Sequence, residues 1–139
     1  MTFQNGNYYS GGVISNYGDV RLMDCTMINN TAVMGGVLYN INGRALIKHC
    51  NIINSTAMSG PISPEGTGYS DARGGVVYTK SDYLYGNGNF GFTSIQDTNI
   101  TNSTARGKNL SSNDGDGGVA YTSSGKLEML LVSMINNTA

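Results

Sequence analysis

Two short motifs recur in fixed order along the chain, and they constrain its fold more than any other feature. The first, "GGV", begins at Gly11, Gly35, Gly74 and Gly117, and the second, "NNTA" or "NSTA", ends at Ala32, Ala57, Ala105 and Ala139. The compact units Gly11–Ala32 and Gly35–Ala57 are 22 and 23 residues long. Internal repeats with this period are typical of solenoids, in which each unit packs on its neighbours. We therefore expect one repeat domain or segment over residues 1–139.

The repeat divides this segment into units with three insertions. The expected units are residues 11–34, 35–73, 74–116 and 117–139, and residues 1–10 align with the tail of a preceding unit. Insertions follow Ala57 and Ala105, and a third, "YLYGNGNFGF", lies inside the third unit. Because the repeat continues on both sides of each insertion, we expect the insertions to form loops outside a stacked core.

Apolar residues alternate with mixed ones before each repeated Asn, and this period of two indicates strands. The apolar or small columns lie two, four, seven and nine positions before the Asn: Phe3, Met27, Ile52, Ile100 and Met134; Cys25, Cys50, Thr98 and Val132; Leu22, Ile47, Ile95 and Met129; Val20, Ala45, Thr93 and Leu127. Short strands with glycine at the turns predict an all-β fold, a single-stranded parallel β-helix solenoid of about four to five coils. Right-handed coiling is expected because parallel crossovers are nearly always right-handed.

The composition excludes several classes of protein. Only 12% of residues are charged and the formal net charge is -1, which argues against a nucleic-acid partner. The chain has no run of 18 apolar residues, so we expect no membrane span, and no secretory signal is visible. Twenty glycines and nine tyrosines without tryptophan fit many short strands and tight turns.

The motifs resemble those of a known group of surface proteins. "GGVI", "GGVL", "GGVV" and "GGVA" are similar to the GGA(I/L/V) tetrapeptide of polymorphic outer-membrane proteins and of methanogen adhesin-like proteins. "FQNG", "MINN", "IINS" and "ITNS" resemble degenerate forms of their FxxN motif, and large surface proteins of ciliates have similar repeats. The resemblance implies a β-helical, surface-exposed stalk or passenger region involved in adhesion or coating. Val replaces Ala in each "GGV", and Phe remains only at Phe3.

The chain begins within one unit and stops at the end of another, without polar capping segments. Uncapped solenoid ends expose strand edges and an open core. We therefore expect either a piece of a longer β-helix or subunits that associate end to end, since a heterologous contact that does not close gives a filament.

The repeated Asn allows two interpretations. Asn29, Asn54, Asn102 and Asn136 each begin an Asn-x-Thr glycosylation acceptor. Alternation instead places them inward, where a structural ladder of amides satisfies buried polar groups. Asn109 lies in an insertion and is the best single glycosylation candidate, and Asn99, on the outward phase, comes second.

Three further groups have a site interpretation and a plainer alternative. Cys25 and Cys50 share a column, which allows a disulfide between coils, although free buried thiols are favoured. Residues Ser111–Gly118 carry Asn and Asp at calcium-ligand spacing, but a solvated turn is favoured. His49 lies in a column between Asp24 and Asp97, which is better explained as an outward polar ladder than as an acid–base pair. We expect no catalytic residues, no metal and no cofactor.

Tyr39, Tyr78 and Tyr121 each stand four residues after the first Gly of their unit. They could stack on sugar rings or on one another. The combined expectation is a non-catalytic structural or adhesive segment of an extracellular cell-surface protein, with glycosylation left open. The alternatives are the subunit of a head-to-tail, glycan-coated extracellular fibre and a carbohydrate-binding or carbohydrate-processing β-helix.

Overall fold

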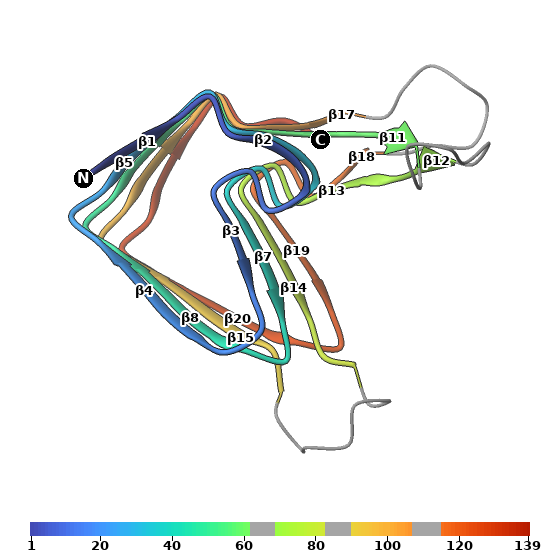
Figure 1. Cartoon of the computed structure of the whole chain (residues 1–139). Coiled ribbons are helices and arrows are strands. Elements are labelled where there is room, and N and C mark those ends of the chain that lie inside the picture. The colour runs from blue at the N-terminus through green and yellow to red at the C-terminus, as the bar shows by residue number, and fades with distance from the viewer. Residues whose placement is uncertain (62–68, 83–89, 107–114) are drawn as a thin grey trace.

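The computed structural model describes residues 1–61, 69–82, 90–106 and 115–139. Among these residues there is no helix, and parallel strands stack into sheets (Figure 1). The fold is thus all-β and of the parallel β-helix-like class that the alternation predicts. Asn109 and Ser111–Asp114 lie outside the described residues, so the glycosylation hypothesis for Asn109 and the calcium hypothesis for Ser111–Gly118 keep their status as sequence predictions.

Four sheets carry most of the strands, and the chain visits them in a repeating order, which we call a coil. Sheet A contains β1 (Thr2–Gln4), β5 (Thr26–Ile28), β9 (Asn51–Ile53), β16 (Asn99–Thr101) and β21 (Ser133–Ile135). Sheet B contains β2 (Asn7–Ser10), β6 (Thr31–Met34), β10 (Thr56–Met58), β13 (Ala72–Arg73), β17 (Thr104–Arg106) and β18 (Gly115–Asp116). Sheet C contains β3 (Ile14–Asn16), β7 (Leu38–Ile41), β14 (Val77–Lys80) and β19 (Ala120–Ser123). Sheet D contains β4 (Asp19–Met23), β8 (Arg44–Lys48), β15 (Phe92–Gln96) and β20 (Lys126–Leu130).

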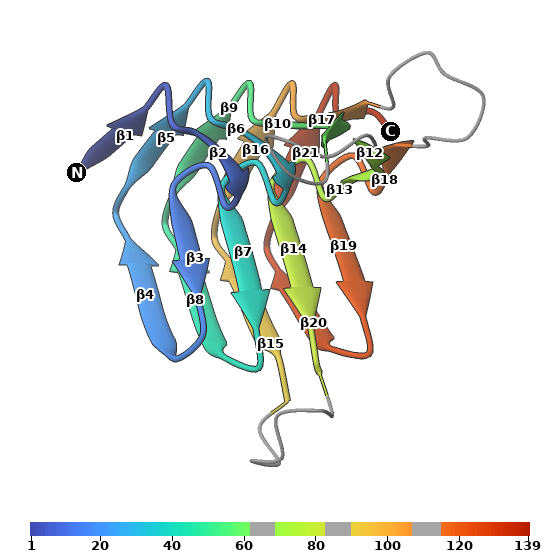
Figure 2. The same ribbon diagram turned by 45° about the vertical axis from the view of Figure 1, so that its right-hand side comes forward.

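The coils stack in register, so equivalent residues of successive units are partners across the strands (Figure 2). Ile47 pairs with Leu22 on one side and Ile95 on the other, and Ile52 pairs with Met27 and Ile100. All of the columns expected to be apolar contribute to one hydrophobic cluster, which is joined by the valines of the "GGV" motif. The inward phase predicted for sheets A and D is therefore confirmed.

Corners between the sheets are made by residues with a left-handed backbone. Asn29, Asn54, Asn102 and Asn136 all have φ between 54° and 56°, at the corner from sheet A to sheet B. Asn is one of the few residues other than glycine that tolerates this conformation, because its short side chain can bond locally. The corner from sheet B to sheet C uses Gly11, Gly35, Gly74 and Gly117, with φ between 64° and 68°. Both repeated motifs thus contain a residue that the coil needs in order to turn.

Two of the insertions leave sheet B at equivalent places in successive coils. Strand β10 is followed by the antiparallel pair β11 (Gly60–Pro61) and β12 (Tyr69–Ser70), and β13 then resumes sheet B beside β6. Strand β17 is likewise followed, after the gap in the described residues, by β18 beside β13. The third insertion lies between β14 in sheet C and β15 in sheet D (Figure 1). The flanking stack stays in register, as expected for insertions outside the core.

Candidate functional site

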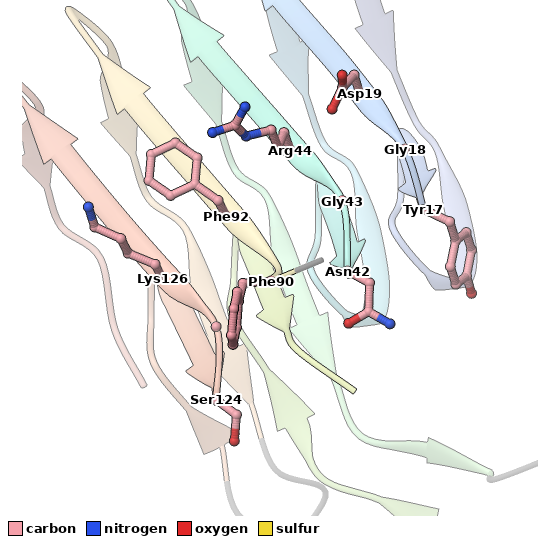
Figure 3. A pocket seen from close by; sticks show the side chains of 11 residues that line it. Tyr17, Gly18, Asp19, Asn42, Gly43, Arg44, Phe90, Phe92, Ser124 and Lys126 are labelled. Carbon is pink, nitrogen blue, oxygen red and sulfur yellow. The ribbon is translucent and has the colours of Figure 1, made fainter. Parts of the chain in front are cut away.

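A groove of about 830 Å³ lies at the edge where sheet C passes into sheet D. Its lining comes from four coils, and Phe90 comes from the end of the third insertion: Tyr17, Gly18, Asp19, Asn42, Gly43, Arg44, Phe90, Phe92, Ser124, Gly125 and Lys126 (Figure 3). The corner contributes glycines and small polar residues, whereas the first residue of each sheet D strand contributes a larger side chain. Stacking therefore builds the groove from equivalent positions that lie far apart in the sequence.

The floor of the groove is a column of outward-facing side chains on sheet D. In the strand register, Arg44 stands opposite Asp19 on one side and Phe92 on the other, and Phe92 stands opposite Lys126. The order across the strands is therefore Asp19, Arg44, Phe92, Lys126. Adjacent strands lie about 4.8 Å apart. The column is outward because the next residue of each strand, such as Ala45, belongs to the core. It presents one acid, two cations and one aromatic ring in a row.

The cations of this column differ in their local partners. The Nζ atom of Lys126 lies 5.3 Å from the centre of the Phe92 ring and 3.8 Å from the Glu128 carboxylate. Arg44 is exposed, and within the described residues it has no ion pair with Asp19 or with any other acid. The Arg44 guanidinium therefore keeps its donors available to a ligand.

Two exposed aromatic side chains border the floor. Tyr17 is 69% exposed and Phe90 is 60% exposed, which is high for large rings. Both lie in the groove lining with Phe92 (Figure 3). Concave sites lined by aromatic rings with a few polar groups are typical binding sites for small ligands and saccharides.

A buried polar network supports the corner from inside. Asn16 donates through Nδ2 to Asn40 Oδ1 at 2.8 Å, and Asn40 donates to the carbonyls of Gly43 and Phe92 and to Thr93 Oγ1, each at 3.0 Å. Thr79 and Thr93 share a hydroxyl contact of 2.7 Å. These bonds hold the backbone at Gly43 and Phe92, which both line the groove. The sequence contains an unused signal for this ladder, because Asn16, Asn40, Thr79 and Thr122 all stand five residues after the first Gly of a unit.

Replacing Asn40 by leucine is expected to lower the free energy of unfolding by about 3 kcal/mol, because several buried polar groups lose their partner together. Asn51→Leu is the matched control, since Asn51 is exposed and the hydrogen bond that its side chain accepts from Asn99 lies at the surface. Urea unfolding of both variants measures the difference. Similar small effects for the two would show that the internal network does not stabilise the corner.

The tyrosine column forms a stack of its own on sheet C. Tyr78 lies between Tyr39 and Tyr121, with ring centres 5.3 and 5.5 Å apart and interplanar angles of 11° and 8°. Tyr17 meets the outer side of Tyr39 edge-on at 6.4 Å, and the Arg73 guanidinium lies 5.2 Å from the centre of the Tyr121 ring. Since Tyr78 is only 4% exposed, this geometry favours the aromatic stack over the sugar-stacking role considered for these three residues.

Burial in this stack, followed by the charges of Tyr17 and Tyr78, raises the pKa of Tyr39 to about 12. A raised folded-state pKa means that the folded protein keeps the phenol proton to higher pH than the unfolded chain, so stability falls as the pH rises from about 10 to about 12. We expect Tyr39→Phe to lose less stability than the wild type over this pH range. Thermal unfolding at a series of alkaline pH values tests this, and parallel loss in both proteins would contradict it.

The repeated Asn residues are exposed, so their expected inward position is wrong. The left-handed corner breaks the alternation by one residue, and the next position points inward instead: Asn30, Ser55 and Ser103 are buried, and Asn137 is partly buried. Asn30 and Asn137 bond there to backbone groups of neighbouring coils. A ladder contact does join Asn54 Nδ2 to Asn29 Oδ1 at 3.1 Å, but at the surface. Asn99 is also exposed and donates to Asn51 Oδ1.

His49 lies between two exposed carboxylates, as the outward-ladder interpretation expects. Its Nδ1 atom is 3.6 Å from Asp24 Oδ1, and its Nε2 atom is 3.4 Å from Asp97 Oδ2. Asp24, His49 and Asp97 all have a left-handed backbone and form the corner from sheet D to sheet A. None of the three lines the groove, so the structure does not join them to the candidate site.

Cys25 and Cys50 are free and buried. Their sulfurs donate to the carbonyls of Met23 and Lys48, at 3.0 and 3.2 Å. Desolvation by burial raises the pKa of the Cys50 thiol, which lowers its thiolate fraction at neutral pH. We expect a thiol reagent to react slowly with the folded protein and rapidly with both cysteines in denaturant. Fast labelling of Cys50 under native conditions would show that the core is open at this coil.

Searches against protein-family models, curated proteins and solved structures found no match. Within the described part of the chain, no cluster of His, Cys, Asp and Glu could hold a metal ion. No helix of the described residues has the length and apolar character needed to cross a bilayer. The candidate functional site is therefore the open groove at the edge of sheets C and D, which is lined by aromatic and cationic side chains.

Proposed function

We propose that the chain is a non-catalytic structural or adhesive segment of an extracellular cell-surface protein, built as a right-handed parallel β-helix solenoid. The observation that carries this proposal is the in-register stacking of equivalent residues in all four sheets. Such a stack resists bending and offers long regular faces, which suits a stalk or an adhesive rod. The resemblance of the "GGV" and "MINN" repeats to those of surface adhesins supports the same class.

The exposed sequon asparagines agree with an extracellular location. Asn29, Asn54, Asn102 and Asn136 form one column, and Asn99 lies on the neighbouring outward column of sheet A. Adjacent coils lie about 4.8 Å apart, which is too close for a bulky glycan on every member of a column. If this protein is glycosylated, occupancy therefore alternates along the column.

Surface labelling of intact source cells tests the location directly. A membrane-impermeant amine reagent should modify the exposed Lys126 before the cells are lysed, whereas an abundant internal protein in the same cells stays unmodified. Glycopeptide mapping of the same sample then reports the state of each sequon. Labelling only after lysis would contradict the proposed location.

The groove favours a second candidate function from the same surface, which is carbohydrate binding. Exposed Tyr17 and Phe90 beside Phe92 supply ring faces, and Arg44, Asn42 and Lys126 supply donors. Among the described residues that line the groove, Asp19 is the only acid, whereas glycoside hydrolysis uses a pair of carboxyl groups. The geometry therefore supports binding rather than cleavage.

A further inference from the structure

We propose that the groove at the edge of sheets C and D binds an acidic oligosaccharide, of the class that carries uronate carboxylates. The proposal rests on the adhesive function proposed above and names the ligand class for it. It assigns a role to Arg44, Phe92 and Lys126, which no repeat motif explains. The glycan chain lies across the strands of sheet D, along the direction in which the coils stack.

The charges of the groove floor match an anionic ligand. Arg44 and Lys126 flank Phe92 on the two neighbouring strands (Figure 3). Arg44 is exposed and has no ion pair in the described part of the chain, so its guanidinium can bind a carboxylate through two parallel hydrogen bonds. Lys126 is 69% exposed and only 3.8 Å from Glu128, an arrangement that leaves two of its three donors free.

The acid at one end gives the groove a direction. Asp19 is exposed and lies beside Arg44 on the neighbouring strand, at the end of the column away from Lys126. A second carboxylate cannot lie beside Asp19 without like-charge repulsion, so the ligand's uronates belong over Arg44 and Lys126. The Asp19 carboxylate then accepts hydrogen bonds from neutral hydroxyl groups at that end. Asn42, whose side chain already bonds to the backbone of Asp82, has one further amide N–H to donate.

The aromatic side chains suit the apolar faces of sugar rings. Phe90 and Tyr17 border the floor with most of their surface exposed, so a sugar ring can contact their aromatic surface. Ring stacking adds affinity without requiring a particular charge. Together the rings and cations specify a molecule that is both pyranose-like and anionic.

The spacing of the column fits a chain of sugars. Asp19, Arg44, Phe92 and Lys126 occupy four consecutive strands, each about 4.8 Å from the next. An extended pyranose chain advances by about one ring length per sugar, which is similar to one strand spacing. One sugar therefore lies over each strand, and Arg44 and Lys126 face sugars two positions apart.

Calorimetric titration with de-esterified trigalacturonate tests this inference, because three sugars span Arg44, Phe92 and Lys126 without reaching Asp19. The methyl-esterified trisaccharide is the neutral control of the same length. We expect the acid oligomer to bind at least tenfold more tightly than the ester. Arg44→Gln and Lys126→Gln should each weaken binding by about tenfold, whereas Arg106→Gln, an exposed change on sheet B, should leave it unchanged. Far-UV circular dichroism verifies that each variant is folded.

The proposal would be overturned by no binding of the acid oligomer to the wild-type protein, by equal binding of acid and ester, or by equal losses for Arg106→Gln and Arg44→Gln. Competition by an unrelated acidic peptide with equal affinity would also overturn it, since it would show a general anion patch. Surface labelling of intact cells is independent of these titrations. A surface protein that binds no uronate would remove only the ligand, whereas labelling only after lysis would remove the proposed function itself.

Discussion

Gly36→Ala is expected to prevent folding or to lower the free energy of unfolding by at least about 3 kcal/mol. A Cβ atom on Gly36 would overlap the carbonyl oxygen of Gly75 in the next coil and would lie 2.8 Å from the amide nitrogen of Thr56. Both contacts are backbone atoms of a packed corner, so neither can move aside without displacing a coil. Urea unfolding followed by circular dichroism measures the loss.

Gly18→Ala is the matched control for this change. Gly18 is exposed, and its added methyl group would have no atom within 4 Å. The control is therefore expected to change stability by less than about 1 kcal/mol, in either direction. If Gly36→Ala were as mild as Gly18→Ala, the second glycine of "GGV" would not lie against the neighbouring coil.

Ile95→Ala is expected to destabilise the protein by about 2–5 kcal/mol, the usual range for truncating a buried Ile. Ile95 is fully buried in the middle coil and pairs with Ile47 and Met129, so the cavity has packed coils on both sides. Leu130→Ala is the control, because Leu130 is 52% exposed on the adjacent strand of sheet D. Denaturant midpoints of both variants compare the two sites, and equal shifts would mean that the Ile95 column does not form the core.

The sequence predicts the fold class and the core because both depend on local alternation repeated in every unit. The columns through Ile47 and Ile52 point inward as the period of two requires. The same alternation gives the wrong side for the repeated Asn, since it fails at a left-handed corner such as Asn54. A pattern of side-chain types alone does not show the backbone angle at which a strand ends.

The groove depends on features that a repeat pattern does not contain. Arg44, Phe92 and Lys126 form a column of unlike residues, so comparison of the units gives no signal for them. Phe90 is the described residue at the end of the insertion, and its position beside the corner is a tertiary property. The internal ladder of Asn16 and Asn40 differs from the groove in this respect. Its column is polar in every unit, so comparison of the units can reveal it from the sequence.

The measurement that tests the central claim most directly is an NMR map of inter-strand contacts between equivalent residues of successive coils. Stacking in parallel register predicts amide-to-α-proton contacts from Tyr39 to the neighbourhood of Tyr78 and from Tyr78 to that of Tyr121, and none from Tyr39 to Tyr121. Contacts in an antiparallel pattern, or shifted by one residue, would contradict the account. Such a result would remove the tyrosine stack, the exposed Asn column and the groove together.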